Sequence, residues 1–334
     1  MKNLGKIVKD IGEKGLIERV KDFCAKDMVG DDAAVINLSA GQSLVVTTDV
    51  LVDGVHFSDR TTSPFDVGWR AATANLSDLA AMGATPIGIT VGLSLPGEVA
   101  IEWVDNLYGG LNACLERYNT SILGGDICYS PIITVAINAF GQVFPNRIIS
   151  RNNANPGDAI VVTGNHGNSR AGLELLLHPS DRKQNLCSAD RDYLIVAHQR
   201  PIPRFDILES LWQVCLQPRV AGMDSSDGLA DALVQICRAS KVGARVDLRK
   251  IPILPSLSRI FSPQQALQYA LYGGEDFELV LCLHPKPATA LVELLGKDAA
   301  IIGRITEGQD VALIDSKGVY PKQLLTLDGG FQHF

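Results

Sequence analysis

The chain has 334 residues, of which 46% are hydrophobic, 20% charged and 6% aromatic, a composition typical of a globular protein long enough for two domains. Its formal charge of −7 argues against a general nucleic-acid surface, which needs clustered Lys and Arg. Seven widely spaced cysteines without a CxxC pair predict neither a disulfide framework nor a zinc ribbon. No apolar run in the sequence approaches the roughly 20 residues of a transmembrane helix, so we expect no membrane association and a cytoplasmic protein.

The first half of the sequence alternates predicted helices and strands, as in an α/β domain. Apolar residues at helical spacing predict an amphipathic helix at residues 12–24. Two short β-branched runs, at residues 33–37 and 44–48, predict a strand pair. An Ala-rich stretch predicts a long helix at residues 65–82 that ends at Gly83. The other elements expected here are a strand at 86–95, a helix at about 100–118, and strands at 121–123 and 132–143.

A second domain is predicted to start after Arg151, because residues 152–157 have the composition of a linker or turn. We therefore divide the chain into domains at residues 1–150 and 151–334. A predicted buried strand at 159–163 leads into a loop, Gly-Asn-His-Gly-Asn, that opens a helix at about 169–177. Such a loop suits a bound anion and an ordinary strand-to-helix turn equally well. Further helices are expected at 203–217 and 229–239, strands at 245–247, 277–283 and 300–305, and a loop or short helix at 179–191.

Aspartates recur beside Gly, Ser or Thr at the ends of predicted strands, where α/β folds place functional groups. The segments are Gly-Asp-Asp (30–32), Thr-Thr-Asp (47–49), Asn-Leu-Ser-Asp (75–78), Gly-Gly-Asp (124–126), Asp-Ser-Ser-Asp-Gly (224–228) and Gly-Gly-Glu-Asp (273–276). Each pattern taken alone is better explained as a turn or a helix N-cap.

Asp78 is the exception, because it lies inside an apolar helical stretch where an unpaired carboxylate is costly to bury. No Lys or Arg lies within four residues of it, so a metal ion is a better partner than a helical salt bridge. Oxygen ligands without a Cys/His cluster favour Mg²⁺, which usually joins carboxylates to substrate phosphates. The pattern therefore points to phosphoryl transfer, although the chain has neither a GxxxxGK[ST] loop nor the protein-kinase motifs HRD and DFG.

Nine segments, taken in order, resemble the thiamine-monophosphate kinases, a family of the aminoimidazole-ribonucleotide-synthetase-like superfamily of ATP-binding proteins. They are GDDAAV (30–35), TTDVLVDGVHF (47–57), NLSDLAAMGA (75–84), GGD (124–126), PGDAIVVTG (156–164), RPIPR (200–204), MDSSDGL (223–229), GGEDFEL (273–279) and GFQHF (330–334). The resemblance runs from about residue 12 to the end of the chain.

This resemblance implies a two-domain PurM-like α/β fold, in which the N-terminal domains of a homodimer share a β-barrel and the C-terminal domain is an α/β sandwich. It implies ATP and thiamine monophosphate as substrates, and ADP as a product. The residues implied to hold several Mg²⁺ ions are Asp32, Thr47, Thr48, Asp49, Asp78, Asp126, Asp224 and Asp227, with Asp78, Asp126 and Asp224 as the catalytic group. Those implied to contact ATP are Tyr108, Gly125, Asp126, Arg151 and Ser226. Those implied to contact thiamine phosphate are His56, Glu275 and Phe331.

Three positions depart from the family pattern: Asn152 and Arg170 replace small residues, and Ser225 replaces an apolar one. None removes an implied ligand. His56 alone would be read as a hydrogen-bonded structural residue, and Phe331 as core packing, but an aromatic ring could also stack on thiamine. Glu275 could offset the positive thiazolium.

Two other kinds of protein are alternatives to a kinase of this family. Superfamily relatives such as selenophosphate synthetase and the hydrogenase maturation factor rely on a functional cysteine, whereas this chain ends in Gln-His-Phe and Cys24 lacks glycine-rich surroundings. A catalytically silent scaffold protein would have lost some of the carboxylates, and all eight implied metal ligands are present. The chemistry agrees with the kinase, since a phosphate monoester is largely a dianion at neutral pH and needs little base catalysis.

Overall fold

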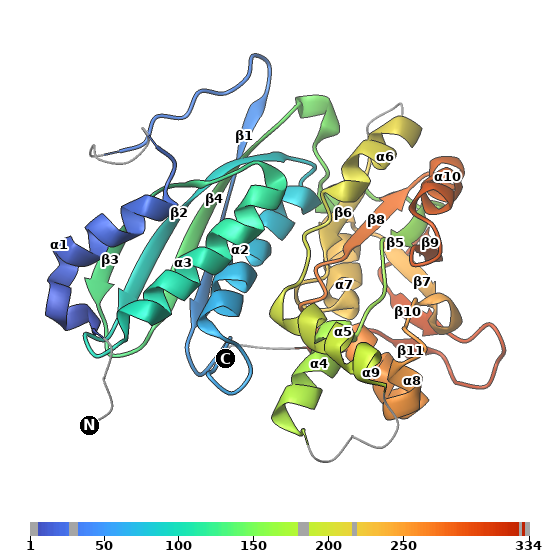
Figure 1. The fold of residues 1–334 in the computed structure, drawn as a ribbon. Helices are drawn as coiled ribbons and strands as arrows, with labels where there is room; N and C mark the ends of the chain where they lie inside the picture. The colour runs from blue at the N-terminus through green and yellow to red at the C-terminus, as the bar shows by residue number, and fades with distance from the viewer. Residues whose placement is uncertain (1–5, 27–32, 180–186, 216–218, 327–328, 331–334) are drawn as a thin grey trace. The chain divides into compact units, whose positions relative to one another are not determined.

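The computed structural model describes residues 6–26, 33–179, 187–215, 219–326 and 329–330. The chain forms two compact units (Figure 1). Unit 1 comprises Met1–Leu79 and Ala84–Phe144, and unit 2 comprises Ala80–Gly83 and Pro145–Phe334. Within the described ranges, no helix is both long and apolar enough to cross a membrane.

Unit 1 contains a four-stranded sheet with helices over one face (Figure 1). The strand order is β1-β4-β2-β3, with β4 antiparallel to both β1 and β2, and β3 parallel to β2. The elements are α1 (Val8–Val20), a 3₁₀ turn (Lys21–Phe23), β1 (Ser43–Val52), α2 (Pro64–Ala81), β2 (Thr85–Leu95), α3 (Ile101–Leu115), a second 3₁₀ turn (Glu116–Tyr118), β3 (Ile122–Tyr129) and β4 (Thr134–Val143).

The two faces of this sheet have different environments. Along β4, Val135, Ile137 and Ala139 are fully buried, whereas the residues between them remain partly exposed. Successive strand residues point to opposite faces, so the buried set packs toward the helices and the other set lies on an open face. On β1 this alternation puts Thr47 and Asp49 on the helical side and Thr48 on the open side.

Helices α2 and α3 pack closely because each has a glycine at their contact. A Cβ atom on Gly68 would lie 1.9 Å from the carbonyl oxygen of Leu107, and one on Gly110 would lie 1.8 Å from that of Phe65. Any side chain at either position would push the two helices apart. This close packing fixes α2, the helix that carries Asp78.

The predictions for this unit are mostly confirmed. The helix at 65–82 and the strand at 86–95 match α2 and β2 within one residue. The strand predicted at 33–37 is wrong: that segment forms no strand, and Val35 is 76% exposed, so burial does not reinforce its β propensity. The strand predicted at 44–48 is part of the longer β1, whose partner is β4. The first helix starts at Val8 and is interrupted at Gly12, which has φ 65°.

Unit 2 contains a seven-stranded mixed sheet in the order β11-β10-β7-β9-β5-β8-β6. Its strands are β5 (Ala159–Val162), β6 (Ala221–Asp224), β7 (Gly243–Asp247), β8 (Leu279–Leu283), β9 (Ala300–Thr306), β10 (Val311–Ile314) and β11 (Gln323–Leu324). Its helices are α4 (Asn168–Leu177), α5 (Ser188–Gln199), α6 (Asp206–Val214), α7 (Leu229–Ser240), α8 (Leu257–Ile260), α9 (Pro263–Tyr272) and α10 (Pro285–Leu295), with 3₁₀ turns at Pro145–Arg147, Arg151–Asn153 and Leu248–Lys250.

The central strands of unit 2 bury both faces. On β8, Val280 and Cys282 belong to a core with α7 and α9, whereas Leu279, Leu281 and Leu283 belong to a core with α6 and α10. A strand buried on both faces is a continuous apolar run instead of an alternating one, as the sequence Leu-Val-Leu-Cys-Leu shows.

Several elements of unit 2 were not predicted from the sequence. Helix α5 begins at Ser188, inside the segment assigned to a loop or short helix, and β6, α8, α9, α10, β10 and β11 were also missed. The helix predicted at 203–217 is shorter, because α6 begins at Asp206 and ends at Val214. The Pro-containing residues 201–204 before it form neither a helix nor a strand, since the residue preceding a proline disfavours helical geometry.

Candidate active site

Strand β1 and helix α2 bring together the first group of candidate metal ligands. The Thr47 hydroxyl donates a hydrogen bond to Oδ2 of Asp78, although the two residues are 31 positions apart in the sequence. The backbone N–H of Asp49 donates to Oδ1 of Asn75 at 3.2 Å. Thr47, Asp49 and Asp78 are all partly buried. Their oxygens form a set of hard donors of the kind that Mg²⁺ prefers.

Thr48 and Asp126 belong to a second group, on the open face of the same sheet. Thr48 donates to Oδ1 of Asn138 at 2.7 Å, and the Asn138 amide reaches Thr90 at 3.3 Å. Asp126 is exposed and lies opposite Gly92 in the sheet register. The structure therefore does not bring Thr48 and Asp126 together with Thr47, Asp49 and Asp78: the two groups lie on opposite faces.

Gly125 precedes Asp126 at a point where strands β3 and β2 approach closely. A Cβ atom on Gly125 would lie 2.2 Å from the carbonyl oxygen of Val91, so only glycine fits there. Tyr108 is 2% exposed, and its ring packs against that of Phe23 with centroids 5.7 Å apart. Burial raises the pKa of the Tyr108 hydroxyl. Of the residues implied to contact ATP, Tyr108 is thus the one whose side chain is covered.

His56 lies in the turn after β1. Its Nδ1 accepts a hydrogen bond from the backbone N–H of Val52 at 3.1 Å, so the neutral ring carries its proton on Nε2. Arg70 donates to the His56 carbonyl oxygen at 3.3 Å. These contacts orient the ring and leave Nδ1 unsuited to proton abstraction.

In unit 2, strand β6 ends at Asp224, which is 2% exposed. The Ser226 hydroxyl donates to Oδ1 of Asp224 at 3.0 Å, and Asp227 is exposed. Ser225 is 1% exposed, and its hydroxyl has no hydrogen-bond partner among the residues that the structure describes. Arg151 is exposed and donates to the Gln235 side chain at 2.7 Å.

The loop between α9 and β8 packs against this Asp-Ser-Ser-Asp turn. The backbone N–H of Glu275 donates to the Ser226 carbonyl oxygen at 2.7 Å, and the N–H of Ser225 donates to the Glu278 carbonyl oxygen at 2.8 Å. The side chain of Glu275 is 36% exposed and lies 3.7 Å from Nδ1 of the buried His198. Backbone hydrogen bonds therefore join the two motifs in unit 2, with Glu275 beside Ser226.

Asp276 occupies the glycine-containing loop that could have bound an anion. Its carboxylate accepts hydrogen bonds from the backbone N–H groups of Gly167 at 2.6 Å and Ser169 at 2.9 Å, at the first turn of α4. Burial raises the pKa of Asp276 to about 7, while these two hydrogen bonds act in the opposite direction. The chain's own carboxylate thus caps this helix, which makes the loop a structural turn.

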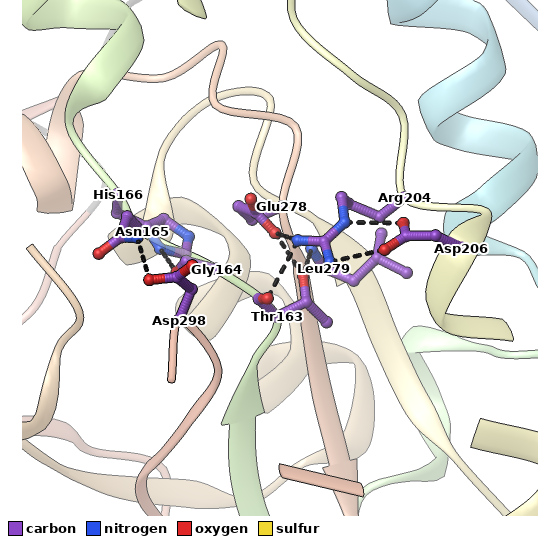
Figure 2. Close-up of polar contacts among 9 residues, drawn as sticks. All are labelled: Thr163, Gly164, Asn165, His166, Arg204, Asp206, Glu278, Leu279 and Asp298. Atoms are coloured by element: carbon purple, nitrogen blue, oxygen red, sulfur yellow. Dashed lines mark hydrogen bonds and ion pairs between the residues drawn. The ribbon is translucent and has the colours of Figure 1, made fainter. Parts of the chain in front are cut away.

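Sequence reasoning missed a polar network next to this loop (Figure 2). Arg204 forms an ion pair with Glu278, and Thr163 donates to the same carboxylate at 2.6 Å. Both charged residues occur in motifs that carried the resemblance, RPIPR and GGEDFEL, but their separation of 74 positions hid the contact.

The metal site and two of the predicted site residues stay predictions. Asp32 and Phe331 lie outside the residues that the structure describes. Within the described part, no three His, Cys, Asp or Glu side chains are grouped closely enough to hold a metal ion by themselves. Any ion held by these carboxylates would need further ligands, such as substrate phosphates.

Cys24 lacks the features of an activated thiol. Its Sγ donates to the Val20 carbonyl oxygen at 3.5 Å, and burial raises its pKa. A nucleophilic cysteine instead has a lowered pKa. This observation weighs against an enzyme that relies on a reactive cysteine near its N-terminus.

Family models and related proteins match almost the whole length of the chain. The model of AIR synthase related protein, N-terminal domain, matches residues 30–143, and that of the C-terminal domain matches residues 155–316. The chain is 51% identical to the thiamine-monophosphate kinase of Synechococcus elongatus over 330 residues, which cover 97% of each protein.

Solved structures give the same result. The structure of thiamine-monophosphate kinase from Stenotrophomonas maltophilia is similar with a TM-score of 0.78 at 34% identity, covering 89% of this chain and 95% of that one. The structure of AaThiL complexed with AMPPCP and TMP is similar with a TM-score of 0.73 at 32% identity, covering 97% of this chain and 99% of that one. The chain has the mixed α/β fold of two AIR synthase related domains and belongs to the thiamine-monophosphate kinase family.

Proposed function

We propose that this chain transfers the γ-phosphoryl group of ATP to thiamine monophosphate and releases thiamine diphosphate and ADP. The observation that carries the proposal is the contact between Thr47 and Asp78, beside Asp49, in a member of this kinase family. The contact places three oxygen-bearing side chains where β1 meets α2. The relative AaThiL was solved in complex with AMPPCP and TMP, which supports a nucleotide and a phosphorylated acceptor as the ligands.

The donor chemistry of these residues fits Mg²⁺, because all the candidate ligands are carboxylates or hydroxyls and none is Cys or His. When bound, the ions would supply the positive charge that offsets repulsion between the two phosphate groups. We assign their ligands to Asp32, Thr47, Thr48, Asp49, Asp78, Asp126, Asp224 and Asp227, and the catalytic part to Asp78, Asp126 and Asp224. Thr47 holds Asp78 in place through its hydroxyl, and Ser226 does the same for Asp224.

We assign residues 1–150 to a domain that binds ATP and Mg²⁺ and forms the dimer. We assign residues 151–334 to a C-terminal α/β sandwich, which the cores on both faces of the unit 2 sheet support. We assign ATP to Gly125, Asp126, Arg151 and Ser226, with Tyr108 contributing only if its ring is uncovered. We assign the thiamine phosphate to His56, Glu275 and Phe331, with the Glu275 carboxylate opposing the positive thiazolium.

In the reaction, a phosphate oxygen of thiamine monophosphate forms a bond to the γ-phosphorus while the bond to the β-phosphate oxygen breaks. The acceptor is largely a dianion at neutral pH, since its second pKa is near 6, so the enzyme has no proton to remove from the nucleophile. This agrees with His56, whose Nδ1 already accepts a backbone hydrogen bond. The chain's residues therefore act by positioning the phosphates and balancing their charge.

We also propose a cytoplasmic homodimer in which two copies of the unit 1 sheet close a shared barrel. The open face of this sheet exposes aliphatic residues on the edge strand β1: Leu44 is 48% exposed, Val46 55% and Val50 44%. Exposed apolar residues on an edge strand are costly in a monomer, so a second copy is the occupant that we assign to this face.

The product distinguishes this function from its rivals. With ATP and Mg²⁺, the purified protein should consume thiamine monophosphate and form thiamine diphosphate and ADP in equal amounts. Free thiamine should remain, because its neutral hydroxyl needs an activating base. Chromatography that detects AMP, or efficient use of free thiamine, would contradict the assignment. Absence of any ATP turnover would instead favour a silent scaffold protein.

A further inference from the structure

The ion pair between Arg204 and Glu278 joins the segment before α6 to the segment before β8 (Figure 2). The two side chains are only 17% and 15% exposed. Nη1 of Arg204 also donates to the Thr163 carbonyl oxygen at 3.0 Å. Its Nε and Nη2 each donate to the Asp206 carboxylate at 2.9 Å. The guanidinium thus uses its planar fork to hold two carboxylates and a strand end at once.

The loop directly before Glu278 has a strained backbone. Gly274, Glu275 and Phe277 have φ values of 66°, 58° and 52°. For Glu and Phe this left-handed conformation is strained, because Cβ lies too close to the following carbonyl oxygen. Such residues persist only where the surroundings determine their conformation.

The contacts of Glu278 supply that constraint. Its carboxylate accepts from Thr163 at 2.6 Å, and the same Thr163 hydroxyl accepts from the N–H of Leu279 at 2.9 Å. A Cβ atom on Gly164 would lie 2.2 Å from the Glu278 carboxylate, so the glycine leaves room for this side chain. The C-terminal end of the strained loop is therefore anchored to the end of β5.

Stability alone does not explain a charged pair at this place. Burial raises the pKa of Glu278, and the charge of Arg204 offsets only part of that effect. Buried ion pairs often contribute no more stability than apolar side chains of similar size. Buried ion pairs are better attested as a means of selecting one packing arrangement of the surrounding chain over its alternatives.

We propose that Arg204 and Glu278 are positioning residues for the acceptor substrate: their ion pair holds the strained loop so that Glu275 is presented beside Ser226. The inference rests on the proposed function, in which Glu275 contacts the thiamine moiety. Asp276 and Glu278, the other two acidic residues of the motif, face inward and hold the loop, whereas Glu275 has the exposed carboxylate.

The first test compares Arg204→Met, Glu278→Gln and the double variant with the wild type. We expect KM for thiamine monophosphate to rise about tenfold or more in all three, while kcat and KM for ATP stay within about twofold, since only binding of the acceptor is disturbed. Arg204→Met should lower the thermal midpoint, because the buried Glu278 carboxylate loses its cation, and the double variant should recover part of that loss. In Glu278→Gln the midpoint should fall less, because Arg204 keeps its pair with Asp206. A purely structural pair would instead restore KM together with stability in the double variant.

The matched control is Arg249→Met. Arg249 also forms a two-pronged pair, with Asp315 at 2.9 and 3.1 Å, but it belongs to none of the site motifs. Its loss should leave both KM values unchanged. If the Arg204 and Glu278 variants behave like this control, the inference is wrong.

The second test asks whether the pair acts through Glu275. In a Glu275→Gln background, Arg204→Met should raise KM for thiamine monophosphate by less than about twofold, because the two effects share one route and are not additive. Full additivity would overturn the inference, as would a rise in KM for ATP alone. An inactive wild-type enzyme would refute the proposed function itself, which separates the two failures.

Discussion

At the scale of single residues, the side chains of the site differ in what surrounds them more than in chemical type. Asp78 accepts a hydrogen bond from Thr47, Asp276 accepts two from a helix N-terminus, and Asp126 is exposed on a strand. In the proposed function the first shares a metal ion with its neighbours, whereas the second already caps helix α4. A carboxylate's role here follows from its partners, which the sequence motif alone does not specify.

Asp78→Asn should abolish most of the activity without unfolding the protein. Removing one negative charge from the proposed metal site should lower kcat by about 10² or more, whereas the amide keeps the shape of the side chain. Steady-state kinetics over a range of Mg²⁺ concentrations and a thermal melt would measure the two effects. Glu102→Gln, on the exposed side of α3, is the control. Wild-type kcat in Asp78→Asn would remove the metal role.

Ser225→Ala should stabilise the protein by about 1 kcal/mol, because it removes a buried hydroxyl that lacks a partner among the described residues. Urea unfolding would measure the gain, and kcat should not change. Ser226→Ala, which removes the hydroxyl that donates to Asp224, should instead lower kcat. A clear loss of stability in Ser225→Ala would mean that its hydroxyl has a partner.

At the scale of elements, loops and helix ends determine the geometry of unit 2 as much as the strands do. Helix α4 begins at a loop whose N–H groups bind Asp276, and α9 leads directly into the strained residues before β8. The motif Gly-Gly-Glu-Asp-Phe-Glu-Leu therefore combines several structural roles. Asp276 caps α4, Glu278 anchors the start of β8, and Glu275 keeps a partly exposed carboxylate.

Asp276→Asn should change how stability depends on pH. Burial raises the pKa of Asp276 from 3.8 to about 7, so the folded protein binds this proton more tightly than the unfolded chain. The protonated Asp276 carboxyl contributes its full stabilisation below about pH 4. This contribution is lost as the pH rises through about 7. Relative to wild type, Asp276→Asn should therefore gain stability between pH 5 and pH 8, as measured by denaturant unfolding at both values.

The control for this experiment is Glu307→Gln, an exposed position. Its stability relative to wild type should be the same at pH 5 and pH 8. A stability difference for Asp276→Asn that also stays constant would show that this carboxyl is already ionised at pH 5.

At the scale of the whole molecule, the unit 1 sheet has one covered face and one open face with aliphatic residues. A monomer would keep Val46 and its neighbours in water, whereas a symmetric dimer would bury the same surface on both copies. The proposed homodimer would therefore give this face a partner without any further protein.

Light scattering at micromolar concentration should give twice the mass of the chain. Val46→Glu should shift the protein toward monomer, because a buried charge in the interface would be unpaired. Leu294→Glu is the matched control, since Leu294 is 51% exposed on α10 of unit 2 and should leave the dimer intact. A monomer mass for the wild type would contradict the proposed barrel.

The sequence alone was sufficient for the family, for the α/β class and for the elements with strong local patterns. Helix α2 was predicted because its apolar residues recur with helical period and Gly83 ends it. Asp78 was selected as a candidate metal ligand because a carboxylate without a nearby Lys or Arg is costly to bury in an apolar helix. These features depend on residues close together in the chain, so periodicity and composition reveal them.

Only the tertiary structure decided which of those residues meet. It separated Thr47 from Thr48 by sheet face, filled the glycine-containing loop with Asp276, and paired Arg204 with Glu278. It also left residues 33–37 without a strand partner. Each result depends on strand pairing, register and loop conformation, which arise from contacts between distant segments. Local propensity carries no information about such contacts, because the free energy that selects them comes from burial and hydrogen bonding in the folded chain.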